Sequence, residues 1–209
     1  MRVFITGTDT DIGKTVISSW LCLHTGFSYY KPIQTGIAPS SSTSDRSIVY
    51  QISGTSTLKE YWVHEIPNAP QVIGHLCGEK SLKVEDIPIP EADRVVIEGV
   101  GGVLVPLNDQ ELIIDMILYF NAPVILVTRP YLGTINHTLL SLEALQRRNI
   151  VILGVIMNGP CCKAVMHSIQ QHGKIPIIAE FPILETISYR TLQEVSLPRL
   201  LMKALNLED

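Results

Sequence analysis

The chain has 209 residues, of which 46% are hydrophobic, so one domain with a sizeable apolar core is the simplest organisation. Its 16 basic and 20 acidic residues give a net charge of −4, which argues against a general nucleic-acid-binding protein. Its apolar runs are too short to span a bilayer, and a strand is expected from residue 2 onward with no leader, so we expect a cytoplasmic protein without a membrane partner.

Apolar runs and amphipathic patterns alternate along the chain. The predicted strands are Arg2–Thr6, Ser28–Tyr30, Asp93–Ile97, Pro123–Thr128 and Ile150–Met157, with a weaker sixth pattern at Ile175–Ala179. The predicted helices are Thr15–His24, Asp45–Ser53, Asp109–Phe120, Asn136–Arg148 and Lys163–His172. Several strands are rich in Val and Ile on both faces, as buried parallel strands are. The alternation predicts an α/β fold, a doubly wound, mostly parallel sheet flanked by helices, in a single domain over residues 1–209.

Three features interrupt or punctuate this alternation. Residues 32–44 are polar and end in a Ser/Thr run; because they follow a strand, they favour an active-site loop over a flexible linker. Residues 58–90 are the least regular and predict an insertion. Asn108 and Glu111 have the spacing of an N-cap and its reciprocal acid, which predicts a helix start.

The first predicted strand runs into a glycine-rich loop that ends in Gly13-Lys14-Thr15 and is followed by a helix. This strand–loop–helix context predicts a phosphate-binding P-loop. Lys14 supplies a charge for the β- and γ-phosphates, Thr15 can ligate Mg²⁺, and the helix N-terminus favours an anion. Gly7, a further source of turn flexibility, lies one residue farther from Gly13 than the usual P-loop spacing, so Thr8 takes the place of the first glycine.

A P-loop enzyme also needs an acid on the metal side, at the end of another strand. Glu98 follows three apolar residues at the predicted end of a strand, where ligands bind in doubly wound sheets. Gly99, Gly101 and Gly102 allow close backbone approach after it. We therefore favour a metal-side role for Glu98 over an edge-strand glutamate that faces water.

Lys31 and Asp45 are two further candidates. Lys31 ends the second predicted strand and points at the same rim as the P-loop, where it can bind phosphate, act on a substrate or cap the strand. Asp45 opens a predicted helix, and both a metal-side acid and a simple N-cap fit that position.

Five blocks of the chain occur in the order seen in dethiobiotin synthetases, and the chain resembles that family over nearly its whole length. The blocks are residues 7–15 (GTDTDIGKT), 31–36 (KPIQTG), Asp45, 98–102 (EGVGG) and 132–137 (LGTINH). The resemblance implies a P-loop NTPase-like, Mg·ATP-dependent cyclo-ligase of biotin biosynthesis. Such an enzyme joins CO₂ to 7,8-diaminononanoate, through a carbamate and a carbamic–phosphoric anhydride, to form dethiobiotin. A homodimer with shared active sites is also implied.

The resemblance also implies roles for individual residues. The implied catalytic residues are Lys31, Lys14, Thr10 and Asp11. The implied ATP-binding residues are Asp11, Ile12, Gly13, Lys14, Thr15, Val16, Asp45, Glu98, Gly99, Val100, Gly101, Asn158, Gly159, Phe181, Pro182 and Ile183. The implied Mg²⁺ ligands are Thr15, Asp45 and Glu98, and the implied substrate-binding residues are Thr35, Gly133, Thr134 and Asn136.

Four positions depart from the family pattern, the first being Asp11, where the family often has glutamate. Thr35 stands where the family usually has serine, which keeps the hydroxyl and adds a methyl group. Gly159 replaces an aspartate that often follows the base-contacting asparagine, and Ala179 replaces a common glycine in the adenine loop. The last two departures bear on the choice of base rather than on triphosphate binding.

An alternative is a partitioning or positioning ATPase of the ParA/MinD type, which also carries a P-loop on a doubly wound sheet. Those proteins have a second lysine five residues before the P-loop lysine, where this chain has Asp9. No basic amphipathic tail of the membrane-binding kind is evident either. A third class, the amidases of cobalamin synthesis, appends a glutaminase domain that this chain is too short to hold.

Overall fold

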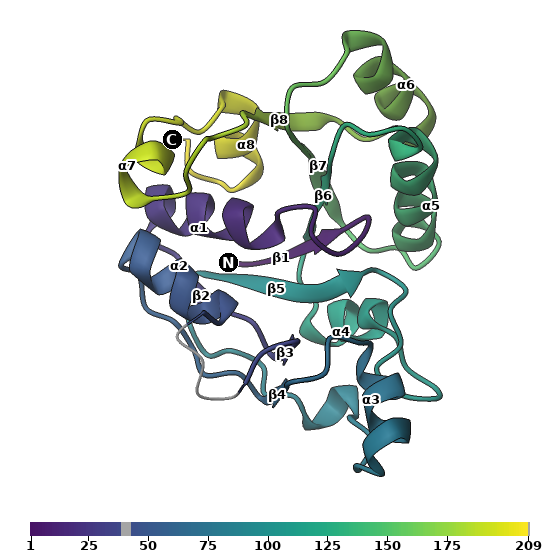
Figure 1. The fold of residues 1–209 in the computed structure, drawn as a ribbon. Helices are drawn as coiled ribbons and strands as arrows, with labels where there is room; N and C mark the ends of the chain where they lie inside the picture. Colours follow the sequence, from purple (N-terminus) through teal and green to yellow (C-terminus); the bar gives the residue numbers. More distant parts are fainter. Residues whose placement is uncertain (39–42, 209) are drawn as a thin grey trace.

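The computed structural model describes residues 1–38 and 43–208 (Figure 1). The strands are β1 (Arg2–Gly7), β2 (Ser28–Tyr30), β3 (Ile33–Thr35), β4 (Trp62–His64), β5 (Val95–Gly102), β6 (Val124–Thr128), β7 (Ile152–Asn158) and β8 (Ile177–Phe181). The helices are α1 (Lys14–Thr25), α2 (Asp45–Ser53), α3 (Pro70–Cys77), α4 (Ile113–Phe120), α5 (Thr134–Gln146), α6 (Lys163–Gly173), α7 (Tyr189–Gln193) and α8 (Arg199–Ala204), with a 3₁₀ turn η1 (Val84–Asp86).

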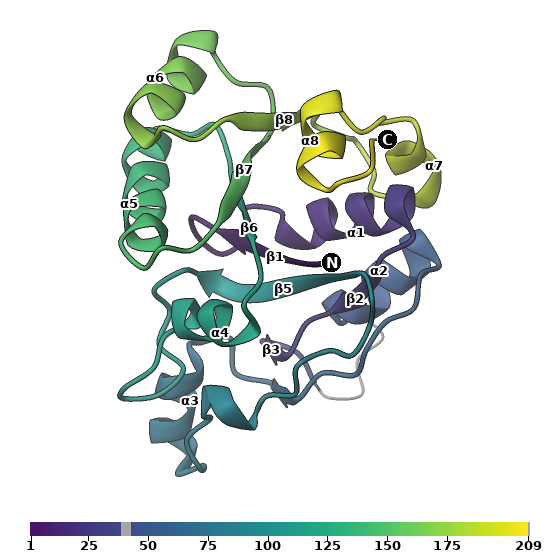
Figure 2. The same ribbon diagram turned by 180° about the vertical axis from the view of Figure 1, so that it is seen from behind.

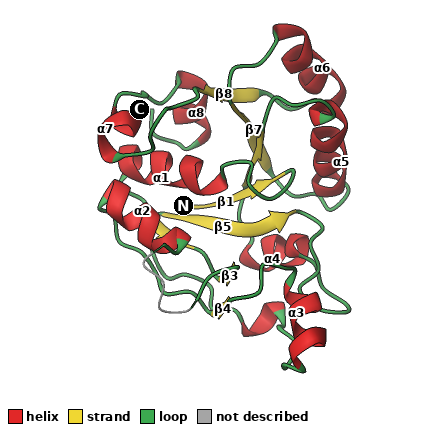
Figure 3. Cartoon of the chain, in the orientation of Figure 1, coloured by secondary structure: helices red, strands yellow, loops and turns green. Residues whose placement is uncertain are grey.

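The main sheet confirms the predicted α/β architecture. Its strand order is β2-β5-β1-β6-β7-β8, and its described pairs are parallel. Helices flank the sheet on both sides (Figure 3). Because β1 pairs with β5 on one side and β6 on the other, the strand order reverses at β1. The loop after β1 therefore opens at the switch point of the sheet, where ligands bind in this fold.

Alternating residues of β1 build the apolar cores on the two faces of the sheet. Val3 and Ile5 pack in one core with residues from α1, α2, α7 and α8. Phe4 packs in the other core with residues from α4 and the end of α5. Figure 2 shows the two groups of helices on opposite sides of the strands. A strand that buries both faces is continuously apolar, which is why the sequence pattern located it.

Strand β5 continues beyond its predicted end at Ile97. Glu98 lies inside the strand, opposite Ile5 of β1, and the pairing resumes at Gly102 after an irregularity. A Cβ atom on Gly99 would lie 2.8 Å from the Phe4 ring, so glycine lets the extended backbone pass this side chain. The prediction of a strand end before Glu98 is therefore wrong, although its carboxylate still faces the rim.

The helix predicted at Asp109–Phe120 begins later than expected. The Asn108 side-chain oxygen accepts the N–H groups of Gln110 at 2.8 Å and Glu111 at 2.9 Å. These bonds close a turn before α4, which starts only at Ile113. The predicted N-cap at Asn108 is wrong because an Asx turn uses the same side-chain oxygen and the same spacing as a helix cap.

The short parallel pair β3–β4, which lies outside the main sheet, was not predicted from the sequence. Each strand has three residues, so its pattern is too short for alternation to indicate a strand. The segment 58–90, predicted as an irregular insertion, contains β4, α3 and η1. Residues 39–42 of the predicted polar loop lie outside the described residues.

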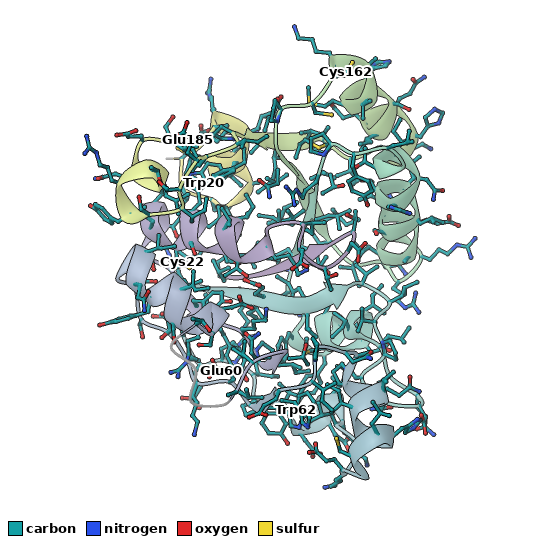
Figure 4. The ribbon with its side chains drawn as sticks, viewed as in Figure 1. Trp20, Cys22, Glu60, Trp62, Cys162 and Glu185 are labelled. Atoms are coloured by element: carbon teal, nitrogen blue, oxygen red, sulfur yellow. The ribbon has the colours of Figure 1, made fainter. Side chains whose placement is uncertain are left out.

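Two short C-terminal helices complete one face of the sheet. Leu192 of α7 and Leu201 of α8 are fully buried against the α1 side. Trp20 of α1, labelled in Figure 4, packs edge-on against Phe181 of β8 with ring centroids 5.1 Å apart. These contacts fix the end of β8 beside the first turns of α1. Among the described residues, no helix combines the length and apolarity needed to cross a membrane.

Candidate nucleotide and metal site

The loop between β1 and α1 has the backbone shape that a phosphate cradle needs. Gly13, which precedes α1, has a φ of +91°, and a Cβ atom there would lie 2.0 Å from the Asn158 amide nitrogen. Asn158 Nδ2 donates to the Ile12 carbonyl at 2.7 Å, and Arg129 Nη1 donates to the Asp11 carbonyl at 3.0 Å. Side chains from the ends of β6 and β7 thus hold the loop through its carbonyl oxygens.

The role of Gly7 differs from the expected one. Gly7 is the last residue of β1, and its φ is not in the left-handed region. A Cβ atom there would lie 2.5 Å from the Ile12 side chain, so the loop folds directly onto this residue. Gly7 therefore permits close packing of the loop, and turn flexibility comes from Gly13.

A buried charge cluster lies beside the loop. The Lys31 ammonium forms ion pairs with Asp45 and with Glu98, the latter at 3.1 Å between Nζ and Oε1. Thr15 donates its hydroxyl proton to the same Oε1 atom at 2.8 Å. Lys31 is 5% exposed and Glu98 is 1% exposed, so these charges are compensated by one another rather than by water.

The two lysines of the site have opposite pKa shifts. Burial, opposed by the Glu98 and Asp45 charges and aided by the Lys31 charge, lowers the pKa of Lys14 to about 8. Burial also acts to lower the pKa of Lys31, but the two carboxylates beside it outweigh burial and raise that pKa. Burial acts to raise the pKa of Asp45, and the Lys31 charge and hydrogen bond hold it below its usual range. The Lys31–Asp45 pair is therefore ionised. A bound anion beside Lys14 would stabilise the charged form of that lysine.

The donor set fits a hard divalent cation. Thr15 Oγ1, Asp45 and Glu98 offer oxygen atoms, the ligands that Mg²⁺ prefers. The Thr15 hydroxyl donates its proton to Glu98, which leaves its oxygen lone pairs for a cation. Asp45 pairs with Lys31 through one carboxylate oxygen and has a second oxygen that could bind a cation. The N-cap of α2 is Ser44, whose Oγ accepts the Ser47 N–H at 3.1 Å. The alternative of Asp45 as a simple N-cap is therefore wrong.

Two adjoining hollows flank the phosphate loop. One, of about 420 Å³, we call the reaction hollow; the other, of about 680 Å³, we call the base hollow. They share Thr10, Asp11, Gly13 and Val16. The other predicted residues in the reaction hollow are Lys14, Thr15, Lys31, Thr35, Asp45, Glu98, Val100 and Gly101. The other predicted residues in the base hollow are Ile12, Asn158, Gly159, Phe181, Pro182 and Ile183.

Four predicted residues lie outside both hollows, as the described part of the chain outlines them. Gly99 packs on Phe4, and Gly133, Thr134 and Asn136 lie at the start of α5. The Thr134 hydroxyl is buried and bonds to Thr128 at 3.0 Å, so its side chain serves the fold. The backbone of Gly133 and the side chain of Asn136 are exposed.

The comparisons with known proteins agree with this geometry. The model of a family described as an AAA domain matches residues 1–191. An ATP-dependent dethiobiotin synthetase of Lawsonia intracellularis is 44% identical over 197 residues, covering 94% of this chain and 95% of the relative. Relatives with the same name from Neorickettsia sennetsu (37% identical, 94% and 92% covered) and Brucella ovis (39%, 90% and 88%) also match. The chain belongs to the ATP-dependent dethiobiotin synthetase family. Membership confirms the predicted class of protein, an ATP-dependent ligase.

Solved structures show that the synthetase fold of this chain is shared more widely. A ParA family ATPase from Chlorobium tepidum has a TM-score of 0.58 at 13% identity, covering 99% of this chain and 98% of that one. The cell division ATPase MinD of Pyrococcus furiosus has a TM-score of 0.57 at 12% identity, with 98% of each chain covered. At such identities the likeness shows the P-loop NTPase fold alone. The ParA/MinD alternative therefore has support only from architecture.

Three residues at the synthetase site were missed by the sequence analysis. Tyr29 donates its hydroxyl to Glu98 Oε2 at 2.9 Å. Gln34 lines the reaction hollow and donates to the Thr35 carbonyl at 3.1 Å. Arg129 reaches the phosphate loop from the residue after β6. Gln34 and Arg129 follow the ends of predicted strands, and that position could have indicated them as site residues. Tyr29 lies within a short apolar strand, so its sequence context indicates only a core residue.

A second cluster of metal-ligating side chains lies away from these hollows. His64, Cys77 and Glu79 bring one ligand atom each within 4.8 Å of one another. However, His64 Nδ1 accepts the backbone N–H of Ile66 at 3.0 Å. A neutral imidazole then carries its proton on Nε2, the atom that faces Cys77 and Glu79. This nitrogen is therefore a hydrogen-bond donor and does not offer a lone pair to a cation.

Proposed function

We propose that this protein forms dethiobiotin from 7,8-diaminononanoate, CO₂ and ATP, with Mg²⁺ as cofactor. The observation that carries the proposal is the buried Lys31, held by Asp45 and Glu98 in the same hollow as Lys14 and Thr15. This arrangement puts two lysines and the oxygen atoms of Thr15, Asp45 and Glu98 around one hollow, which supports a cation beside the phosphates. Family membership supplies the substrate class.

The chemistry needs positive charge and positioning more than it needs a nucleophilic side chain. One amine of the substrate attacks CO₂ and loses a proton, which gives a carbamate anion, a poor electrophile. The γ-phosphoryl group of ATP is transferred to a carbamate oxygen, which gives a carbamic–phosphoric anhydride and ADP. The second amine attacks the carbamate carbon, loses a proton and expels phosphate, which closes the cyclic urea. Phosphoryl transfer of this kind is accelerated chiefly by alignment and electrostatic stabilisation.

The residues of the reaction hollow divide these tasks. We assign Lys14 to the β- and γ-phosphates and Lys31 to the carbamate and the transferred phosphoryl group. Thr15, Asp45 and Glu98 would hold Mg²⁺, which offsets charge on the phosphate oxygens when bound. Thr10 and Asp11, on the wall between the two hollows, would contact the diamine or its carbamate. The hydroxyl of Thr35 would contact the substrate in the same hollow.

The base hollow would hold the nucleoside of ATP. Asn158 and Gly159 line one wall, and the segment from Phe181 to Ile183 lines another. The backbone of Gly99 to Gly101, which follows Glu98, would approach the nucleotide on the phosphate side, as the family resemblance implies.

We also propose a homodimer in which the start of α5 completes the partner's site. The backbone at Gly133 and Thr134 and the positive end of the helix dipole would bind the substrate carboxylate, beside Asn136. The Thr134 N–H itself donates to the Tyr131 carbonyl at 3.0 Å, so the contact would come mainly from Gly133 and the helix dipole. In a single chain these residues lie outside the reaction hollow. The fully exposed Leu132 next to them supports burial by a second subunit.

Product analysis tests the proposed reaction directly. ATP, Mg²⁺, bicarbonate and 7,8-diaminononanoate should give equal amounts of dethiobiotin, ADP and phosphate, and omission of the diamine should stop ATP consumption. Rapid ATP hydrolysis without the diamine, stimulated by DNA or by lipid vesicles, would contradict the proposal and favour the ParA/MinD alternative.

A further inference from the structure

The Glu98 carboxylate has hydrogen-bond donors on both of its oxygens. Oε1 accepts from Thr15 at 2.8 Å and from Lys31 at 3.1 Å, and both donors line the reaction hollow. Oε2 accepts from the Tyr29 hydroxyl at 2.9 Å. Oε1 of Glu98 is therefore hydrogen-bonded by residues of the reaction hollow, and Oε2 is hydrogen-bonded by Tyr29, which does not line that hollow.

Tyr29 approaches Glu98 from the core. It lies in β2, opposite Val96 of β5, and its side chain is 0% exposed within the apolar core that includes Ile17 and Val49. Tyr29 does not line the reaction hollow, as the described residues outline it. A ligand that enters the hollow can thus reach Lys31 and Thr15 but has no path to the tyrosine hydroxyl.

The Tyr29 hydroxyl is the donor in its contact with Glu98. Its proton has Oε2 of the carboxylate as acceptor, because an ionised carboxylate can only accept. Hydrogen bonds to a charged acceptor are stronger than those between neutral groups, so this contact restrains the carboxylate orientation.

Lys31 and Thr15 cannot give the same restraint in the loaded site. Under the proposed function, the Lys31 ammonium serves the carbamate and the phosphoryl group, and a cation beside Asp45 competes with it for the same carboxylates. The Tyr29 contact is the one that a ligand leaves intact. Partners of this kind, which orient a metal ligand without touching the metal, typically change metal affinity or activity about 10- to 100-fold when removed.

We propose that Tyr29 is a positioning residue that holds Glu98 in the orientation needed for Mg²⁺, and thereby sets the affinity of the nucleotide site for the cation. The inference rests on the proposed metal role of Glu98. It goes beyond that role because it assigns a function to a buried core tyrosine that contacts neither nucleotide nor substrate.

The test compares Tyr29→Phe with Tyr30→Phe. Each variant loses one hydroxyl oxygen from the same strand, but Tyr30 faces the other core, where it stacks on Phe120 with ring centroids 6.4 Å apart. ADP affinity is measured by calorimetry in excess Mg²⁺ and in EDTA, and the ratio of the two affinities is the gain due to metal. We expect Tyr29→Phe to reduce this gain about tenfold or more. Its affinity in EDTA should match the wild type, and Tyr30→Phe should change neither value.

The outcomes separate this inference from the proposed function. An unchanged metal-dependent gain in Tyr29→Phe would overturn the inference, and so would an equal loss of ADP affinity with and without Mg²⁺, since that result marks a structural residue only. Glu98→Gln supplies the second arm. If Glu98→Gln abolishes the gain while Tyr29→Phe keeps it, the metal role stands and the positioning role falls. If Glu98→Gln keeps the gain, the metal role of Glu98 in the proposed function fails, and this inference fails with it.

Discussion

Four charged side chains with balanced charge, Lys14, Lys31, Asp45 and Glu98, converge at the reaction hollow, and a fifth, the exposed Asp11, lies on the wall that it shares with the base hollow. Burying an ion costs several kcal/mol unless a partner and hydrogen bonds offset the cost, so this cluster is stable only as a set. The Lys14 ammonium is the exception, because it donates only to the Asp9 carbonyl, at 2.8 Å, among the bonds described for it. The pKa of Lys14 is lowered because its buried charge lacks a close anionic partner, and a bound phosphate would supply that partner.

Substitution of each lysine by glutamine should separate binding from chemistry. Lys14→Gln removes a charge from the phosphate cradle, so ATP affinity should fall about 10- to 100-fold along with turnover. Lys31→Gln leaves Asp45 and Glu98 to bind a cation, so ATP affinity should stay within a few-fold while single turnover slows about a hundredfold or more. Calorimetry with ATP and rapid-quench single-turnover rates check both. A near-wild-type rate for Lys31→Gln would show that Lys31 only neutralises the two acids.

The lowered pKa of Lys14 predicts a pH dependence of ADP binding. In the free protein Lys14 loses its proton as the pH rises through about 8. Bound phosphate favours the charged form, so ADP binding in EDTA should weaken above pH 8, by about tenfold between pH 7.5 and 9.5, with uptake of a proton. Calorimetry in buffers of different ionisation enthalpy measures both effects. Lys14→Arg, whose side chain stays charged at these pH values, should give a flat profile. A wild-type profile as flat as that of Lys14→Arg would contradict the prediction.

At the scale of elements, the two ends of α1 offer a controlled comparison of glycine substitutions. Gly13 at the start and Gly26 at the end both have positive φ, of +91° and +69°. A Cβ atom on Gly26 would meet nothing within 4 Å, whereas one on Gly13 would meet the Asn158 amide at 2.0 Å. Gly26→Ala should therefore cost about 1–2 kcal/mol of stability, the price of the backbone conformation, and leave ADP binding intact.

Gly13→Ala should cost more than Gly26→Ala and abolish ADP binding, because the loop has to move away from Asn158. Urea unfolding gives the two free energies of unfolding, and calorimetry gives the two affinities. Equal stability losses, or retained ADP binding in Gly13→Ala, would show that the Asn158 contact does not shape the loop.

Sequence patterns located the elements that bury both faces and missed the elements that depend on tertiary contacts. β1 and β6 are continuous apolar runs and were predicted within one or two residues. The strands β3 and β4 and the helix α3 are short, so their few apolar residues show no periodicity that would indicate a strand or a helix from the sequence alone. The same limit applies at the site: motif order predicted that Lys31 and Glu98 share a rim, but their direct ion pair and the Tyr29 contact depend on the packing of β2 against β5.

At the scale of the whole molecule, the strand order brings distant segments to one crevice. The ends of β1 and β2 supply the phosphate loop and Lys31, and the middle of β5 supplies Glu98. The ends of β7 and β8 supply the base hollow. The start of α5 follows β6, yet its exposed residues Gly133 and Asn136 lie outside both hollows as the described residues outline them. Among the described residues of one chain's reaction hollow, the positively charged side chains are Lys14 and Lys31, both already assigned to phosphoryl chemistry. The carboxylate at the far end of the proposed diamine substrate would therefore have no further cation to pair with there.

The exposed start of α5 predicts that catalysis requires the dimer. Leu132 is fully exposed at its tip, and Leu140 is exposed on the same helix, which is the apolar surface that a two-fold partner would bury. Leu132→Glu should produce a monomer by light scattering and raise the KM for the diamine at least about tenfold, because the partner's helix start no longer reaches the substrate carboxylate. ADP affinity should be unchanged, since the nucleotide hollows lie within one chain. Leu200→Glu on α8, a second exposed leucine on a different element, should remain dimeric and active. A Leu132→Glu monomer that kept the wild-type KM would show that each chain carries a complete site.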